Sequence, residues 1–195
     1  MHILKNILYG LPLQHVEGIT DRPVKGLRFD SRKVEEGDCY VAQRGTKVDG
    51  HDFIAQAIEN GAKSIVCEKI PKLEVNDVTF VHVEDSSQAL GEMAHNFYGQ
   101  PSDRIKLIGV TGTNGKTTTV SLLYDLFTTL GKRSGLISTV LNRVGDNTVP
   151  ATHTTPDAVQ INQLLAQMVD SDCEYCFMEV SSHAVVQHRI AGLNF

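Results

Sequence analysis

The stretch KLIGVTGTNGKTTTVSLLYDLF, from Lys106 to Phe127, decides the fold of the second half of this chain. Its apolar start, Leu107 to Val110, predicts a buried strand, and a glycine-containing loop follows directly. Beyond the loop, apolar residues recur at helical spacing, namely Val120, Leu122, Leu123, Leu126, Phe127 and Leu130. Gly131 then ends the helical pattern. Strand, glycine loop and helix in this order predict a phosphate-binding loop within an α/β domain.

The residue types of the loop suit polyphosphate binding. The loop consists of Gly112, Thr113, Asn114, Gly115, Lys116, Thr117 and Thr118. The glycines let backbone N–H groups curl inward, and the helix beginning near Lys116 directs the positive end of its dipole at the phosphates. We expect Lys116 to reach the β- and γ-phosphates of ATP and the Thr117 hydroxyl to bind Mg²⁺.

The loop departs from the strict pattern G-x-x-x-x-G-K-[ST]. Val110 stands where that pattern has its first glycine, and Gly109 comes one position too early. The physical context is retained, because strand, glycine turn, Lys-Thr and helix still follow one another. The departure moves the loop away from common kinases and GTPases.

The sequence after the loop alternates strand and helix patterns. RSGLISTV (133–140) predicts a strand, LNRVGDNTVP (141–150) a turn between two extended pieces, and CEYCFMEV (173–180) a third strand. A helix is expected from TTPDAVQINQLLAQMV (154–169), with Thr155 as N-cap and Pro156 at its first position. This alternation predicts a parallel, doubly wound sheet.

Glu179 closes the third predicted strand. An acidic side chain at the carboxyl end of a strand beside a phosphate loop can hold Mg²⁺, directly or through water. We therefore predict a metal-binding and catalytic role for Glu179; the alternative is an ordinary carboxylate that caps the following turn.

Residues 1–100 predict a separate small α/β domain. Strand patterns (24–32, 39–45, 63–68 and 78–83) alternate with helical ones (51–61 and 86–98). Gly99 and Pro101 then end the helical pattern, so we expect a domain boundary here and a second domain that spans 101–195.

Composition narrows the range of partners and locations. The net charge of -5 argues against binding nucleic acid through its phosphates. The chain has neither an apolar run of about 18 residues nor the pattern of a signal peptide, so we expect no membrane insertion and a cytoplasmic protein.

The four cysteines are expected to be buried structural thiols. Cys173 and Cys176 should face opposite sides of a strand rather than form a redox or zinc pair.

Several motifs carry a family resemblance. GVTGTNGKTTT resembles the ATP loop of the Mur ligases, ATP-dependent amide-forming enzymes of cell-wall synthesis. DSRKVEEGDCYVAQRGTKVDGHDF (30–53) is similar to the uridine-binding N-terminal domain of this family. THTTPDAVQINQLL (152–165) and MEVSSHAVVQHRIAGLNF (178–195) look like the branch that adds the third residue of the wall peptide. The resemblance covers essentially the whole chain.

The resemblance implies a set of substrate-binding residues. These are Phe29, Ser31, Thr46, Lys47, Val48, His153, Thr154, Thr155, Ser181, Gln187 and Arg189. The first five would hold the UDP moiety and the others the muramoyl-peptide. Thr155 could instead act only as a helix cap, and Arg189 could be a solvated surface arginine.

The resemblance also implies a reaction. The enzyme would use ATP and Mg²⁺ to join diaminopimelate or lysine to UDP-MurNAc-L-Ala-D-Glu through an acyl phosphate. Family members are longer and carry a domain for the incoming amino acid. We therefore expect this chain to be an N-terminal portion, with a truncated central ATP-binding domain, that is inactive by itself.

Three alternatives share part of the pattern. A non-catalytic UDP-sugar or nucleotide-binding module would carry the same residues. A small P-loop kinase would need an arginine-bearing lid after the third strand. The related ligase that adds the terminal dipeptide is disfavoured by HTTPD (153–157) and EVSSH (179–183).

Overall fold

The computed structural model describes residues 2–45, 48–150 and 155–195. The chain forms two compact units, Met1–Phe97 and Tyr98–Phe195, which are described separately. Within the described ranges, no helix is long and apolar enough to cross a membrane.

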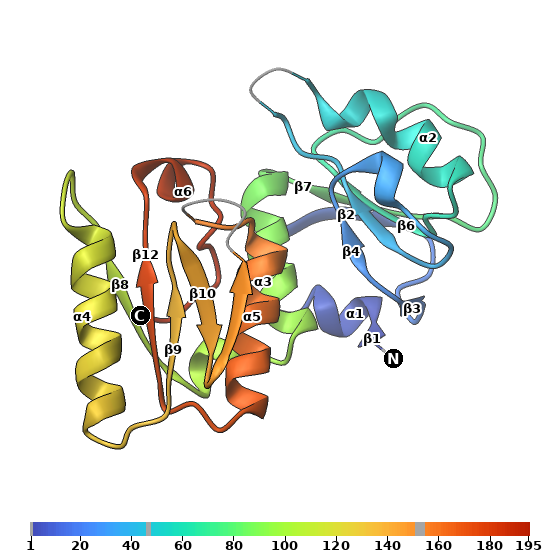
Figure 1. The fold of residues 1–195 in the computed structure, drawn as a ribbon. Coiled ribbons are helices and arrows are strands. Elements are labelled where there is room, and N and C mark those ends of the chain that lie inside the picture. Colours follow the sequence, from blue (N-terminus) through green and yellow to red (C-terminus); the bar gives the residue numbers. More distant parts are fainter. Residues whose placement is uncertain (1, 46–47, 151–154) are drawn as a thin grey trace. The chain divides into compact units, whose positions relative to one another are not determined.

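The first unit is built on a five-stranded sheet. Its order is β2-β7-β6-β5-β4, with β2 antiparallel to β7 and the other neighbours parallel (Figure 1). The strands are β2 (Leu13–Glu17), β4 (Leu27–Arg28), β5 (Cys39–Val41), β6 (Ser64–Cys67) and β7 (Thr79–Val83). A short antiparallel pair is formed by β1 (His2–Ile3) and β3 (Pro23–Val24). The helical elements are α1 (Leu4–Ile7), η1 (Ser31–Lys33), η2 (Gly50–Phe53), α2 (Ile54–Glu59) and α3 (Ser86–Phe97).

The central strands of this sheet are buried on both faces. Every residue of β5 and β6 is buried, and all of them except Ser64 are apolar, as expected for strands that are covered on both faces. Helix α2 packs Ile54 and Ala57 against Tyr40 and Ile65 in the hydrophobic core of this unit. Burial of these side chains supplies most of the free energy that holds the helix on the sheet.

The second unit is a sheet covered by a helix on each face (Figure 1). Its order is β11-β10-β9-β12-β8. The strands are β8 (Lys106–Val110), β9 (Ser134–Ile137), β10 (Leu141–Val144), β11 (Asn147–Pro150) and β12 (Tyr175–Glu179). The helical elements are η3 (Pro101–Asp103), α4 (Lys116–Thr129), α5 (Ala158–Asp170) and α6 (Ser182–Val186). The predicted α/β class is confirmed.

The sheet of the second unit is mixed rather than wholly parallel. Strands β9, β12 and β8 are parallel, as expected, but β10 and β11 form an antiparallel hairpin that extends the sheet beyond β9. The reason is the short connection at Gly145 and Asp146. Two residues can reverse the chain between antiparallel strands, whereas a parallel connection needs a crossover.

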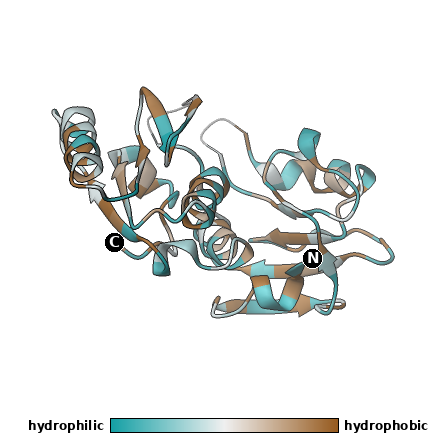
Figure 2. Ribbon diagram, turned by 60° about the horizontal axis from the view of Figure 1, so that its bottom comes forward, coloured by the Kyte–Doolittle hydropathy of each residue, from teal (hydrophilic) through white to brown (hydrophobic). Residues whose placement is uncertain are grey.

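Helix α4 buries a narrower face than its sequence predicted. Val120 and Tyr124 are buried, whereas the side chains of Leu122, Leu126 and Leu130 are more than half exposed. Positions 120 and 122 lie about 200° apart around a helix, so the apolar residues cannot all face one sheet. In Figure 2, the ribbon of α4, the leftmost helix, shows both hydrophobic and hydrophilic residues.

The predicted N-cap of α5 is wrong. Asp157 occupies the cap, in an extended backbone conformation, and its carboxylate accepts a hydrogen bond from Gln160 N at 2.9 Å. Pro156 thus precedes the helix. The hydroxyl of Thr155 is used elsewhere, because it donates to the backbone oxygen of Glu179 at 3.1 Å.

All four cysteines are free and buried, as predicted, but the expected orientation of one pair is wrong. Cys173 lies outside β12, so strand alternation does not apply to it, and it joins Cys176 in the core that packs against α5. Burial raises the pKa of the Cys176 thiol, which disfavours the thiolate that metal binding or redox exchange needs.

The Asp157 cap yields a stability prediction. We expect Asp157→Ala to lower the free energy of unfolding by about 1 kcal/mol, because an N–H at the start of α5 loses its acceptor. Asp157→Asn should retain most of the stability, since an asparagine oxygen also caps. Thermal and urea unfolding would measure both, with Gln163→Ala on the exposed middle of α5 as a control. Equal stability of Asp157→Ala and the wild type would contradict the assignment.

Candidate functional site

The loop between β8 and α4 has the curled backbone that a phosphate cradle requires. Gly112 has a φ of 147° and Gly115 a φ of 81°, values that L side chains rarely adopt. Gly115 is the N-cap of α4 and gives the helix no side-chain cap, so its first N–H groups are left for another acceptor. Lys116 Nζ donates to the Gly112 carbonyl oxygen at 2.7 Å, so the lysine lies across the loop.

Glu179 lies beside this loop because of strand pairing. Strand β12 runs parallel to β8, and Glu179 is in register with Val110, the last residue of β8. Strand β9 flanks β12 on its other side. The carboxyl ends of three parallel strands therefore meet at one edge of the sheet, where ligands commonly bind in open α/β folds.

The Glu179 carboxylate is buried, with 1% of the residue exposed, and it connects two segments. Its Oε2 accepts a hydrogen bond from Thr117 Oγ1 at 2.9 Å. Its Oε1 accepts from Thr139 N at 2.8 Å, and Thr139 Oγ1 donates to Oε2 at 3.2 Å. These donors are neutral hydroxyls and an amide, so the described residues supply hydrogen bonds but no positive charge directly to this carboxylate.

A second cluster forms where α6 begins and ends. Ser181 caps α6, since its Oγ accepts from Ala184 N at 3.1 Å, and Ser181 N donates to Thr155 Oγ1 at 3.1 Å. The Arg189 guanidinium donates to Gln187 Oε1 through Nε at 2.9 Å and Nη2 at 2.6 Å. Its Nη1 donates to the Thr155 carbonyl oxygen at 2.7 Å. The fold thus brings Thr155, Ser181, Gln187 and Arg189 together.

Arg189 is consequently a braced, half-buried side chain rather than a freely solvated one. Its planar fork still has N–H groups beyond those three bonds, and a guanidinium can bind a carboxylate or phosphate oxygen. The Thr155 hydroxyl, which neighbours Ser181 Oγ at 3.3 Å, adds a polar contact to the same cluster.

Three of the remaining predicted residues lie in the described part of the first unit. Phe29 is partly exposed directly after β4, and Val48 is exposed, with its carbonyl oxygen accepting from Gly45 N at 3.0 Å. The Ser31 hydroxyl is buried and donates to Gln56 Oε1 at 2.8 Å, which leaves its lone pairs to accept.

Neighbouring charges hold the turn at Ser31. The Asp30 carboxylate caps η1 and accepts hydrogen bonds from Arg32, and these bonds lower the pKa of Asp30. Four further predicted residues, Thr46, Lys47, His153 and Thr154, lie outside the described residues.

Thr139 was missing from the predicted site. It comes two residues after β9, at the same sheet edge as Glu179, and its sequence context GLISTV reads only as an apolar strand. The available signal was a hydroxyl at the carboxyl end of a strand that adjoins β12. That signal depends on strand order, which the sequence does not state.

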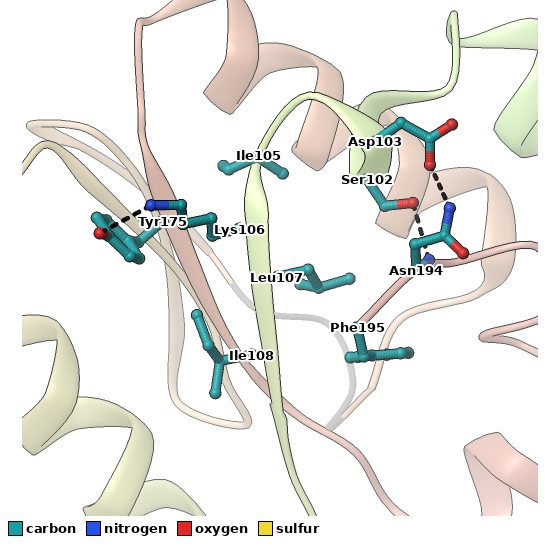
Figure 3. Close-up of a pocket in the computed structure, with 9 residues that line it drawn as sticks. All are labelled: Ser102, Asp103, Ile105, Lys106, Leu107, Ile108, Tyr175, Asn194 and Phe195. Atoms are coloured by element: carbon teal, nitrogen blue, oxygen red, sulfur yellow. Dashed lines mark hydrogen bonds between the residues drawn. The ribbon is translucent and has the colours of Figure 1, made fainter.

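A hollow lies along the outer edge of β8, away from this centre (Figure 3). It is lined by Ser102, Asp103, Ile105, Lys106, Leu107, Ile108, Tyr175, Asn194 and Phe195. Asn194 N donates to Ser102 Oγ at 3.0 Å, which holds the last residues beside the strand. The lining includes the first three residues of β8, whereas the phosphate loop follows the carboxyl end of this strand.

Family comparisons cover both units. Residues 23–98 match the description "Mur ligase family, catalytic domain", and residues 110–195 match "Mur ligase middle domain". A Cytophaga hutchinsonii protein named UDP-N-acetylmuramoyl-L-alanyl-D-glutamate–2,6-diaminopimelate ligase is 56% identical over 193 residues. A Clostridium perfringens protein of the same name is 41% identical over 193 residues. These matches cover 98% and 99% of this chain, which spans about 40% of the length of either relative.

Solved structures agree in fold. A structure described as UDP-N-acetylmuramoyl-L-alanyl-D-glutamate–2,6-diaminopimelate ligase has a TM-score of 0.78 and 28% identity, over 98% of this chain and 38% of its own. The MurF ligase of Thermotoga maritima, solved in complex with ADP, has a TM-score of 0.53 and 28% identity, over 82% of this chain and 32% of its own.

The Arg189 contacts predict a local loss of order on substitution. Arg189→Lys should reduce amide protection around residues 181–194 by the equivalent of about 1 kcal/mol, since an ammonium cannot reproduce the fork to Gln187 and Thr155. Hydrogen exchange with mass spectrometry would measure it. Arg104→Lys, at an exposed arginine, is the control. Unchanged protection in Arg189→Lys would show that these contacts do not hold the segment.

Proposed function

Because the chain belongs to the Mur ligase family, we propose that it binds ATP and a UDP-linked muramoyl-peptide in an amide-forming ligase of the MurE type. The observation that carries this proposal is the hydrogen bond from Thr117 Oγ1 to the buried Glu179 carboxylate, at 2.9 Å. It joins the phosphate loop to an acidic group at the carboxyl end of β12. That pairing is the arrangement which phosphoryl transfer requires.

ATP would bind with its phosphates on the loop from Gly112 to Thr118. The unpaired N–H groups at the start of α4 favour an anion there, and Lys116 Nζ lies above the same loop. An incoming phosphate would replace the Gly112 carbonyl oxygen as the partner of Lys116. The adenine-nucleotide complex of the Thermotoga maritima relative supports this choice of ligand.

Mg²⁺ fits the residues beside the loop. The Thr117 hydroxyl can offer a lone pair to a cation while its O–H still donates to Glu179 Oε2, and Mg²⁺ prefers such oxygen ligands. Within the described ranges no three His, Cys, Asp or Glu side chains form a metal cluster, so phosphate oxygens and water would complete the shell. Bound there, Mg²⁺ would neutralise charge on the transferred phosphoryl group.

The proposed reaction has two stages. The terminal carboxylate of the D-Glu residue attacks the γ-phosphorus of ATP, and ADP leaves, which gives an acyl phosphate. The amine of the incoming amino acid then attacks the acyl carbon and releases phosphate. Lys116 stabilises the negative charge of the transferring group, so the protein contributes position and electrostatics rather than a nucleophile.

The substrate would be held by two groups of residues. Ser31, Phe29 and Val48 of the first unit are proposed to contact the uridine end, together with Thr46 and Lys47. In the second unit, the braced guanidinium of Arg189 and the hydroxyls of Thr155 and Ser181 offer donors for the anionic peptide. His153 and Thr154 stay in the predicted set for the same ligand.

Diaminopimelate is the proposed third amino acid. The relatives from Cytophaga hutchinsonii and Clostridium perfringens carry it in their names, which favours it over lysine. The cytoplasmic location and the inactivity of the chain by itself stay predictions.

Nucleotide binding can be tested on the chain directly. Lys116→Ala should weaken the binding of ATP and ADP by at least about tenfold, because a charge-assisted contact to the phosphates is lost. Isothermal titration calorimetry would measure the affinity. Lys132→Ala is the matched control, since Lys132 lies beyond the far end of α4 and pairs with Glu174 on the surface. Equal affinity of Lys116→Ala and the wild type would contradict the phosphate-loop assignment.

Ligase activity needs a protein of the relatives' length. A chimera can be made in which residues 1–195 replace the matching part of the Cytophaga hutchinsonii ligase. We expect ADP release by this chimera to require both UDP-MurNAc-L-Ala-D-Glu and diaminopimelate, with lysine as the comparison. Glu179→Gln should lower kcat by at least about tenfold, because the carboxylate charge is lost while the size is kept. Release of ADP without an amino acid would argue for a simple ATPase instead.

A further inference from the structure

We propose that Thr139 is a positioning residue that fixes the orientation of the Glu179 carboxylate toward the phosphate loop. This inference rests on the proposed function, because it assumes that Glu179 serves a nucleotide-bound cation beside Thr117. Thr139 itself would touch neither nucleotide nor cation. Its effect would reach them through Glu179.

Thr139 contacts both oxygens of the carboxylate. Its backbone N–H donates to Oε1 at 2.8 Å, and its hydroxyl donates to Oε2 at 3.2 Å. Two donors from one residue determine the rotation of the carboxylate about its last bond. The orientation they select is the one in which Oε2 also accepts from Thr117 Oγ1 at 2.9 Å.

Hydrogen bonds of the buried residue Ser138 hold the turn that carries Thr139. Ser138 Oγ donates to the Leu141 carbonyl oxygen at 2.7 Å, and Ser138 N donates to Asn142 Oδ1 at 3.2 Å. Ser138 and Asn142 are both buried, whereas Thr139 is exposed at the rim. The hydrogen bonds of Ser138 thus hold the backbone of the turn, and the Thr139 hydroxyl is used for the contact with Glu179.

The two contacts of Thr139 can be separated by substitution. Valine has the shape of threonine without the hydroxyl, so Thr139→Val keeps the amide bond to Oε1 and loses the bond to Oε2. The carboxylate would keep its bonds from the Thr139 amide and from Thr117 Oγ1 but lose one of the two donors to Oε2, so its orientation toward Thr117 would be less firmly fixed. Because Lys116 and the loop amides bind phosphate without help from Glu179, binding of the nucleotide without metal should not change.

The test compares nucleotide affinity with and without the cation. ADP binding to the 195-residue chain would be measured by calorimetry in Mg²⁺ and in EDTA. Electron paramagnetic resonance of Mn²⁺ with ADP would report the cation directly. The variants are Thr139→Val, Thr139→Ser, which keeps the hydroxyl, and the control Thr148→Val. Thr148 is an exposed threonine of β11 in the same sheet.

Mg²⁺ should increase the affinity of the wild type for ADP. In Thr139→Val we expect this increase to be about tenfold smaller, since a hydrogen bond to a charged group is removed. Its affinity in EDTA should stay within about twofold of the wild type, Thr139→Ser should recover the gain, and Thr148→Val should match the wild type. Mn²⁺ binding should weaken in Thr139→Val alone.

Three results would overturn the inference. A full Mg²⁺ gain in Thr139→Val would show that the hydroxyl does not position Glu179. An equal loss with and without Mg²⁺, together with a lower melting temperature, would show a structural role only. A wild-type chain with no Mg²⁺ gain would refute the metal role proposed for Glu179, and the inference with it; this case is recognised from the wild type alone.

Discussion

The buried carboxylate of Glu179 is the group on which the arrangement of the second unit's site depends. It lies at the carboxyl end of the strand between β8 and β9, and it accepts hydrogen bonds from the segments that follow both neighbours. A buried carboxylate without hydrogen-bond partners costs free energy. The hydrogen bonds therefore restrain the donor residues as well as Glu179. The phosphate loop and the β9–β10 turn are thereby tied to one strand end.

The hydroxyl residues around the site contact Glu179 from three different segments of the chain. Thr117 belongs to the first turn of α4 and Thr139 to an exposed turn, yet both donate to the same oxygen, Oε2. Thr155 donates to the backbone oxygen of Glu179 and accepts from Ser181, which connects the start of α5 to the start of α6. A chain of short polar contacts therefore leads from the phosphate loop to the proposed substrate-binding side.

Features that depend on residues close together in sequence were predicted better than features that depend on contacts between distant segments. The glycine loop and α4 follow from local patterns, because each depends on residues adjacent in sequence. The contact between Thr117 and Glu179 depends instead on the pairing of β12 with β8. The cap of α5 was misplaced by two residues, since Thr155 and Asp157 both suit a cap and only the fold uses Thr155 for Glu179. The leucines of α4 were assigned to a buried stripe because the sequence does not state how wide a face the sheet covers.

The sequence by itself determined the α/β class, the glycine loop between a strand and a helix, and the family, because glycine positions, apolar periodicity and motif order are local properties of the chain. Tertiary structure alone decided which residues surround Glu179. Strand order places the end of β9 beside β12, although 42 residues separate Ile137 from Glu179 in sequence. It also decided that Arg189 is braced by Gln187 and Thr155 rather than solvated. Such contacts join segments whose proximity arises only when the sheet has formed, so no local pattern encodes them.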